Sequence, residues 1–473
     1  MGLVLSGGGA SASFQVGALR YLYDVVGITP TVFAGTSAGS VLAALLAQTD
    51  EHEGQRQILA EIERQYENLQ QASDMMVERD WFSELQKLVP ALQRLGQARA
   101  SHLEPQTITL PALGQSRSRR RVGDGETGPT ARTVIRLPRW DSTLVRETLS
   151  VLWSVRRSRP DFETLLQGGH HEKSLYRPGP IFDRLLGPEL FDADRVAGSG
   201  TELRIAVVGL ESGELRYVTG GGVLVDRTDQ PVPGVAPLPL TDAVHASCAI
   251  PAIYPPVRLG DEHYVDGGTR ENLPVDIVMT SLGVTRCYAV NSLPTGVPVD
   301  TSYADKDMLA IVLRATAGIM SDEVQLDDTV RAQAAGAVLI APEVNVLGVL
   351  EVDPGLLAIA RDYGYLRAAE AHERATPADQ RLSRAVVELR RRIWDEENEL
   401  VAARAAGDPA AELLVELAAL KRQLRDLVAQ VPPGRLPAGA DQWWRRWEGH
   451  LVALEEPVGW VSVMPPTATA VGG

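Results

Sequence analysis

The sequence feature that most constrains this chain is a serine between a short apolar run and an Ala/Leu-rich run. Residues 31–34 are typical of a buried strand, and residues 41–46 are typical of a helix. Between them, Gly35, Ser37 and Gly39 form a G-x-S-x-G motif. We expect a sharp turn there, with the Ser37 hydroxyl accessible beside a helix N-terminus, where developing negative charge is stabilised. This geometry suits a nucleophilic serine, although simple packing also explains small residues at such a junction.

Size and composition indicate a large globular protein. The chain has 473 residues, of which 44% are hydrophobic and 23% charged. Its two cysteines, Cys248 and Cys287, have neither disulfide nor metal-site spacing. No apolar run is long enough to span a membrane and no signal peptide is recognised, so we expect a cytoplasmic protein. The net charge of −15 argues against nucleic-acid binding.

A second glycine-rich turn lies close to the N-terminus. Residues 2–5 predict a short strand, Gly7, Gly8 and Gly9 follow it, and an amphipathic helix comes next. Consecutive backbone N–H groups without side chains form a nest that binds an anion or an oxyanion. The pattern matches neither the phosphate-binding loop nor the dinucleotide fingerprint. A tight turn without a ligand is the alternative.

Residues 50–175 differ in character from their surroundings. They contain predicted helices over 52–72 and 80–97, and then a Gly/Ser/Pro-rich stretch with a basic run. That run includes Arg117, Arg119, Arg120 and Arg121. We expect an insertion that caps the site. Its arginines are either a solvated loop or a patch that contacts lipid headgroups at a membrane surface.

The second half returns to alternating strands and helices. Residues 203–209 predict a strand followed by a hairpin, and residues 243–250 predict a helix that Pro251 stops. A further strand ends in Asp266, Gly267 and Gly268. Such an aspartate is usually a turn former. Its alternative role is to present a carboxylate at the edge of the sheet where α/β enzymes bind ligands.

The C-terminal region predicts a helical hairpin. Thr376 and Asp379 are typical of a helix start, and leucines repeat by three and four residues up to Val431. This apolar seam packs either on the chain's own body or on a second copy, as a homo-oligomer. Four tryptophans follow, and they either dock the tail or contact lipid: Trp443, Trp444, Trp447 and Trp460.

Taken together, these motifs resemble the patatin-like phospholipase family. The resemblance is carried by the glycine run 7–9, the elbow 35–39, Ser247 with Pro251, and Asp266-Gly267-Gly268 followed by Asn272. It covers roughly residues 1–50 and 175–345. It implies a three-layer α/β/α sandwich with a mainly parallel central sheet. The catalytic domain would span 1–375 with its insertion at 50–175, and the helical hairpin and Trp-rich tail would span 376–473.

The resemblance also implies an activity and a site. It implies hydrolysis of lipid esters without a metal or other cofactor, with Ser37 as nucleophile and Asp266 as base. Gly7, Gly8 and Gly9 with the Ala38 N–H would form the oxyanion hole, and Gly35, Gly39, Gly267 and Gly268 would support the motifs. The sequence departs from the family pattern at Ser11 and Ala12, where a basic residue and a glycine are common.

Two other functions remain open from the sequence. One is a Ser–His–Asp hydrolase with His245 or His372 as the base. The other is an inactive scaffold that assembles through the C-terminal hairpin. The intact pair of Ser37 and Asp266 favours an enzyme.

Overall fold

The computed structural model describes residues 1–83, 106–109, 134–137 and 173–436, apart from 298, 300, 301, 305, 307 and 408–410. Contacts divide the chain into one unit of Met1–Val77 with Lys173–Gly473 and a second of Glu78–Glu172. In the second unit, β4 (Gln106–Thr109) pairs antiparallel with β5 (Val134–Leu137). The arginine run, most of the helix expected over 80–97 and the four tail tryptophans lie outside the described residues. Membrane contact and a capping role stay predictions.

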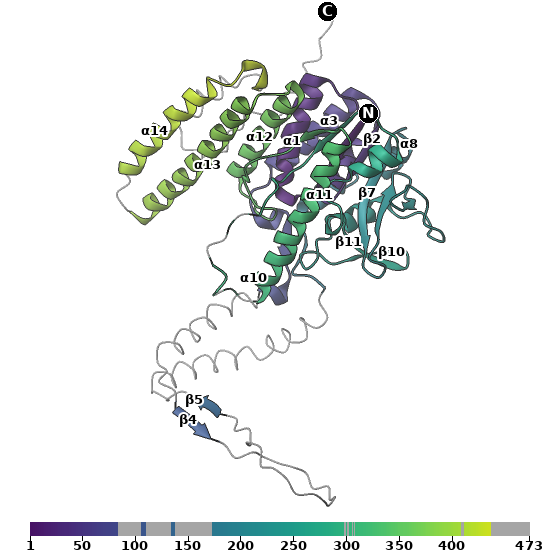
Figure 1. Ribbon diagram of the computed structural model, residues 1–473, viewed down its shortest axis with the longest axis horizontal. Coiled ribbons are helices and arrows are strands. Elements are labelled where there is room, and N and C mark those ends of the chain that lie inside the picture. The colour runs from purple at the N-terminus through teal and green to yellow at the C-terminus, as the bar shows by residue number, and fades with distance from the viewer. Residues whose placement is uncertain are drawn as a thin grey trace, which may run out of the picture. The chain divides into compact units, whose positions relative to one another are not determined.

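The described part of the larger unit is built on a nine-stranded sheet (Figure 1). Five strands run parallel, in the spatial order β7 (Glu202–Gly209), β2 (Val32–Gly35), β1 (Gly2–Leu5), β12 (Cys287–Val290) and β13 (Val338–Ile340). Antiparallel strands extend the sheet around β7, namely β8 (Leu215–Thr219), β9 (Leu224–Val225), β10 (Val257–Leu259) and β11 (Glu262–Asp266). The strands expected from the sequence are confirmed.

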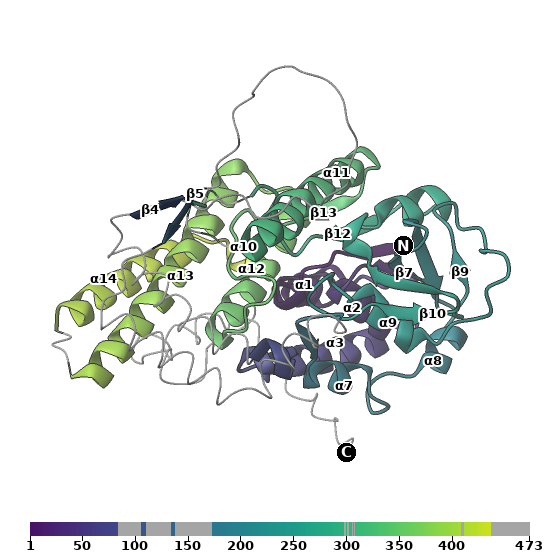
Figure 2. The same ribbon diagram turned by 90° about the horizontal axis from the view of Figure 1, so that it is seen from below.

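Alternation along the strands gives the sheet two buried faces. Leu3 and Leu5 of β1 pack in one core, whereas Val4 packs in the other. The first core is covered by helices α1 (Ala12–Tyr21), α2 (Ala38–Leu46), α3 (His52–Glu67), α9 (Leu240–Ser247) and α12 (Pro354–Glu373). The second is covered by α11 (Ser321–Ala334), which Figure 2 shows across the sheet from α2, and by the π-helical segment Ile277–Ser281. The expected three-layer α/β/α sandwich is confirmed.

Shorter elements complete the larger unit. Strand β3 (Met76–Glu78) pairs with β6 (Tyr176–Pro178), and three short helices lie elsewhere in the chain, α7 (Pro180–Leu186), α8 (Ala193–Gly198) and α10 (Met308–Leu313). Within the described residues, none of the helices combines the length and the hydropathy that crossing a bilayer requires.

Helix α12 is an element that the sequence did not predict. It begins after Asp353, whose side chain accepts a hydrogen bond from the Leu356 N–H at 2.9 Å. Most of its residues are buried on every side, so its sequence lacks the one-sided apolar stripe of a surface helix. It packs closely on α1, because a Cβ at Gly17 or Gly364 would overlap the backbone of the other helix.

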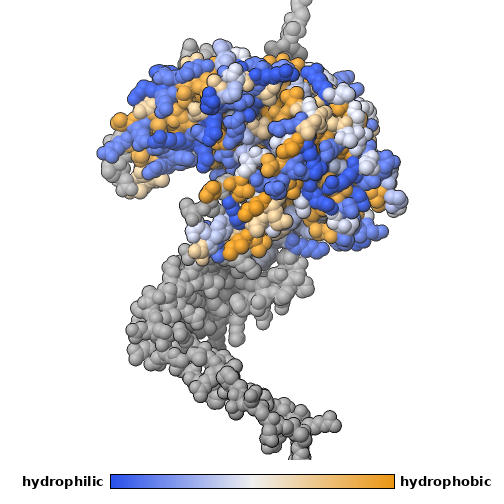
Figure 3. Space-filling view, in the orientation of Figure 1, coloured by the Kyte–Doolittle hydropathy of each residue, from blue (hydrophilic) through white to orange (hydrophobic). Residues whose placement is uncertain are grey.

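The C-terminal hairpin consists of α13 (Pro377–Ala406) and α14 (Ala411–Val428), and α13 packs on α12 (Figure 1). The predicted cap is confirmed, because Thr376 and Asp379 form a capping box. Seam residues of both helices are buried within the chain, among them Val386, Ile393, Leu400, Leu417 and Leu424. Hydrophilic residues dominate the face of the hairpin seen in Figure 3. Self-association through it stays a prediction.

Candidate active site

Ser37 stands at a strained turn between β2 and α2. Its backbone has φ 52° and ψ −128°, a conformation with positive φ that is costly for a residue with a Cβ, by about 1–3 kcal/mol. Two neighbours hold it there. The Ser37 N–H donates to Ser247 Oγ at 2.9 Å, and Ser40 Oγ donates to the Ser37 carbonyl at 2.6 Å. Strain that the surroundings maintain in this way is typical of a functional position.

The two glycines of the G-x-S-x-G motif allow the turn to pack against the end of β1. A Cβ on Gly39 would lie 2.4 Å from the carbonyl oxygens of Leu5 and Ser6. A Cβ on Gly35 would lie 2.4 Å from the Gly39 carbonyl oxygen. No side chain fits at either position, so this close approach requires glycine at both places in the motif.

Sheet register brings Asp266 to Ser37. Strand β8 pairs along one edge of β7. Along the other edge, β2 pairs with the first half of β7 and β11 pairs with its second half. Strands β2 and β11 therefore share one edge of β7 and run towards each other along it. Their ends carry Ser37 and Asp266, whose side chains are hydrogen-bonded and whose residues are each 5% exposed.

Burial sets the proton affinity of this carboxylate. Removal from water raises the pKa of Asp266 from 3.8 to about 7, and hydrogen bonds from Ser37 and from the Gly268 N–H, at 2.8 Å, oppose the rise. Gly267 lies against the backbone of Ala206 in β7. A carboxylate with a pKa near neutrality is a far better general base than an exposed aspartate.

The N-terminal glycines approach the same serine from β1. Gly9, Ser37 and Ala38 line one pocket. Ala38 is the first residue of α2, so its N–H has no acceptor within the helix. The Gly7 N–H instead donates to Asn272, at 3.1 Å to Oδ1 and 3.2 Å to the carbonyl oxygen. Gly7 thus anchors the loop, which leaves Gly8, Gly9 and Ala38 as candidate oxyanion donors.

Ser11, which replaces the basic residue common in the family, is part of the loop's anchorage. It is 3% exposed, and its hydroxyl donates to the Leu347 carbonyl at 3.1 Å. The neighbouring Ala10 N–H donates to the Val349 carbonyl at 2.8 Å. The segment before α12 therefore fixes the glycine loop through two hydrogen bonds, without a cation.

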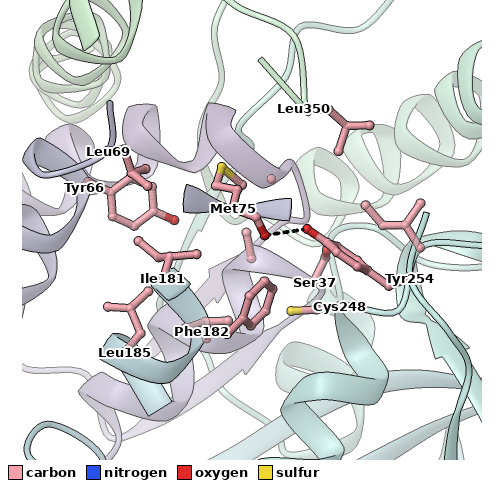
Figure 4. Close-up of a pocket in the computed structure, with 14 residues that line it drawn as sticks. Ser37, Tyr66, Leu69, Met75, Ile181, Phe182, Leu185, Cys248, Tyr254 and Leu350 are labelled. Carbon is pink, nitrogen blue, oxygen red and sulfur yellow. Dashed lines mark hydrogen bonds between the residues drawn. The ribbon is translucent and has the colours of Figure 1, made fainter. Parts of the chain in front are cut away.

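An apolar pocket opens beside Ser37 (Figure 4). Hydrophobic and aromatic side chains supply most of its lining, from Val41, Tyr66, Leu69, Met75, Ile181, Phe182, Leu185, Ile250, Tyr254 and Leu350. Cys248 lies at the same place, and its thiol is hydrogen-bonded to Ser37 and Ser40. A pocket of this composition suits a hydrocarbon chain.

The two histidines considered as bases have other neighbours. His245 of α9 stacks on Phe182 with ring centroids 5.6 Å apart. His372 of α12 hydrogen-bonds the Tyr288 hydroxyl at 3.2 Å. Within the described ranges, no group of three or more His, Cys, Asp or Glu side chains is placed to hold a metal ion.

Sequence reasoning did not assign the roles of Ser247 and Asn272. Both residues belong to the resemblance, but their side chains accept backbone N–H groups of Ser37 and Gly7. Contacts between a side chain and a distant backbone have no periodic signal in the sequence. The motif positions were the only sign that could have drawn attention to them.

Comparison with known proteins identifies the family of this chain. The family model for patatin-like phospholipase matches residues 3–279. A solved structure, VipD from Legionella pneumophila, is similar with 15% sequence identity and a TM-score of 0.30, over 91% of this chain and 80% of that chain. No curated protein sequence matches the chain. Because the family model spans more than half of the sequence and includes both Ser37 and Asp266, this chain belongs to the patatin-like phospholipase family.

Proposed function

We propose that this member of a family of lipid acyl hydrolases cleaves the carboxylic esters of phospholipids or lysophospholipids through a Ser37–Asp266 dyad. The observation that carries the proposal is the hydrogen bond between a strained serine and a buried aspartate at one end of an apolar pocket. Each feature has a separate chemical use, as nucleophile, base and acyl-binding site.

In the acylation step, the Ser37 hydroxyl attacks the ester carbonyl and Asp266 takes its proton. The tetrahedral oxyanion accepts hydrogen bonds from the N–H groups of Gly8, Gly9 and Ala38. Loss of one such donor typically costs about 2.7–4 kcal/mol of transition-state stabilisation. The intermediate collapses when the bond to the alcohol breaks, and Asp266 returns the proton to the leaving alkoxide.

In the deacylation step, water replaces the departed alcohol. Asp266 removes a proton from this water, which attacks the Ser37 ester, and the proton passes to Ser37 as the fatty acid leaves. The same carboxylate thus acts as base twice and as acid twice. Ser37 and water are the two successive nucleophiles, and no electron transfer is needed.

The apolar pocket supports an acyl chain as the recognised group. Each methylene moved from water into such a lining contributes about 0.8 kcal/mol. A lipid ester therefore gains affinity from its chain, and the carbonyl is then held beside Ser37.

An activity-based experiment tests the proposal. We expect an alkyl fluorophosphonate to label Ser37 alone, and we expect Ser37→Ala and Asp266→Asn to lose hydrolysis of a fluorogenic ester and of phosphatidylcholine vesicles. Ser281→Ala and Asp261→Asn change exposed residues and serve as matched controls with unchanged activity. Full activity in Asp266→Asn, or labelling at another residue, would contradict the dyad.

A further inference from the structure

A second cavity adjoins the acyl pocket. It shares Phe182, Cys248 and Tyr254 with the pocket beside Ser37. Its other lining residues do not line the pocket beside Ser37; they are Pro178, Asp242, His245, Pro255 and Val257. Nothing in the dyad chemistry uses this second cavity.

Two aromatic side chains, Phe182 and Tyr254, line both cavities. Phe182 of α7 packs edge-to-face on Tyr254, with centroids 5.9 Å apart and an interplanar angle of 81°. Phe182 also stacks on His245, which lines the second cavity but not the pocket beside Ser37. The Phe182 ring therefore contacts one residue of the shared boundary and one residue beyond it.

The Tyr254 side of this boundary is fixed by hydrogen bonds. Its hydroxyl donates to the Met75 carbonyl at 2.9 Å (Figure 4), and its N–H donates to the Ile250 carbonyl at 3.0 Å. Phe182 has no polar group in its side chain, so ring packing alone holds it. Truncation of Phe182 would therefore remove one wall that the two cavities share.

We infer that Phe182, packed on Tyr254, is a specificity-determining wall between the acyl-chain pocket and the second cavity, and that it limits the length of chain accepted. The second cavity is the extension that a longer chain enters once this ring is removed. The inference rests on the proposed function, because it assigns the pocket beside Ser37 to the acyl group.

The test measures kcat/KM for p-nitrophenyl esters of increasing chain length, each below its critical micelle concentration. In the natural protein, kcat/KM should rise by about fourfold per methylene, the equivalent of burying one CH₂. The rise should stop at the chain length that meets the wall, and we call this length the break. In Phe182→Ala the break should move to longer chains. The acetate ester is the reference substrate for each variant, so the comparison uses the ratio of kcat/KM for each longer ester to that for the acetate.

A filled second cavity provides the matched control. Val257 lines the second cavity but not the first, so Val257→Phe alone should leave the break in place. In the double variant Phe182→Ala/Val257→Phe, the break should return to its original chain length. Acetate-ester activity and circular dichroism report folding of each variant, and Phe182→Leu is a milder substitute if Phe182→Ala does not fold.

Two results would overturn the inference. One is an unchanged break in folded Phe182→Ala or Phe182→Leu, and the other is a double variant that keeps the longer-chain profile. Failure of the proposed function gives a different result, since the natural protein would then hydrolyse none of the esters.

Discussion

Ser37 and Asp266 meet because the strands that carry them end on the same edge of β7. Gly35 lies opposite Ile205, and Asp266 lies opposite Val207, only two residues further along. Strand β2 is parallel to β7 and β11 is antiparallel to it, so their C-terminal ends approach each other. A dyad formed by residues far apart in sequence is thus fixed by backbone hydrogen bonds to one strand.

The first prediction concerns the pH dependence of the reaction. Asp266 acts as a base only when ionised, and burial raises its pKa to about 7. We expect kcat/KM for a short soluble ester to fall about tenfold per pH unit below 7 and to level off above it. A profile measured from pH 5 to 9 checks this, and constant activity down to pH 5 would show that Asp266 is not the base.

The second prediction concerns stability. Because the folded-state pKa of Asp266 is about 7 and the ordinary value is 3.8, ionisation opposes folding as pH rises through that window. Its cost is absent below pH 3.8 and reaches at most about 4 kcal/mol above pH 7. Asp266→Asn should therefore gain in melting temperature over the natural protein between pH 4 and 7. The exposed Asp261→Asn should show no such trend, and a constant difference for Asp266→Asn would refute the linkage.

The third prediction concerns Ser11. Arginine at this position would restore the family's common pattern but would bury a charge where the hydroxyl now donates to Leu347. We expect Ser11→Arg to lose both stability and esterase activity. Ser11→Ala leaves the buried carbonyl without this donor and should cost about 1–3 kcal/mol. Thermal melts and the fluorogenic ester assay measure both effects, and increased activity in Ser11→Arg would contradict this reading of the loop.

The fourth prediction concerns the contact between α12 and α13. Arg390 and Asp362 form an ion pair at 2.8 Å, with their side chains 4% and 0% exposed. Arg390→Met deprives a buried carboxylate of this partner and should cost about 3–5 kcal/mol in urea unfolding. The double variant Arg390→Met/Asp362→Leu should recover most of the loss. On the same helix, Arg384→Met changes an exposed pair with Glu388 and should have little effect.

The fifth prediction concerns self-association. Since the seam of the hairpin is buried within the chain, a second copy must contact its outer surface, where Leu414 and Val415 are 40% and 71% exposed. We expect light scattering to detect an oligomer and Leu414→Glu/Val415→Glu to dissociate it. If both proteins scatter as monomers, the hairpin serves only to pack on its own chain.

The sequence by itself determined the local elements and the identity of the reacting groups. The strands β1, β2, β7 and β11 were predicted because apolar runs bounded by turn residues carry a local signal. Gly35, Ser37 and Gly39 were equally visible, because a strand-to-helix turn has strict steric needs at fixed spacing. The cap at Thr376 follows the same logic of local hydrogen bonding.

Only the tertiary structure decided how those groups act. The raised pKa of Asp266 comes from burial by elements distant in sequence, and the commitment of the Gly7 N–H to Asn272 depends on how two loops pack. Helix α12 escaped prediction because it is enclosed on all sides, which removes the periodic contrast that a sequence pattern needs. The boundary at Phe182 likewise exists only where α7 packs against Tyr254. Neighbouring residues determine local sterics and local hydrogen bonds, whereas burial and long-range contacts arise only when the chain is folded.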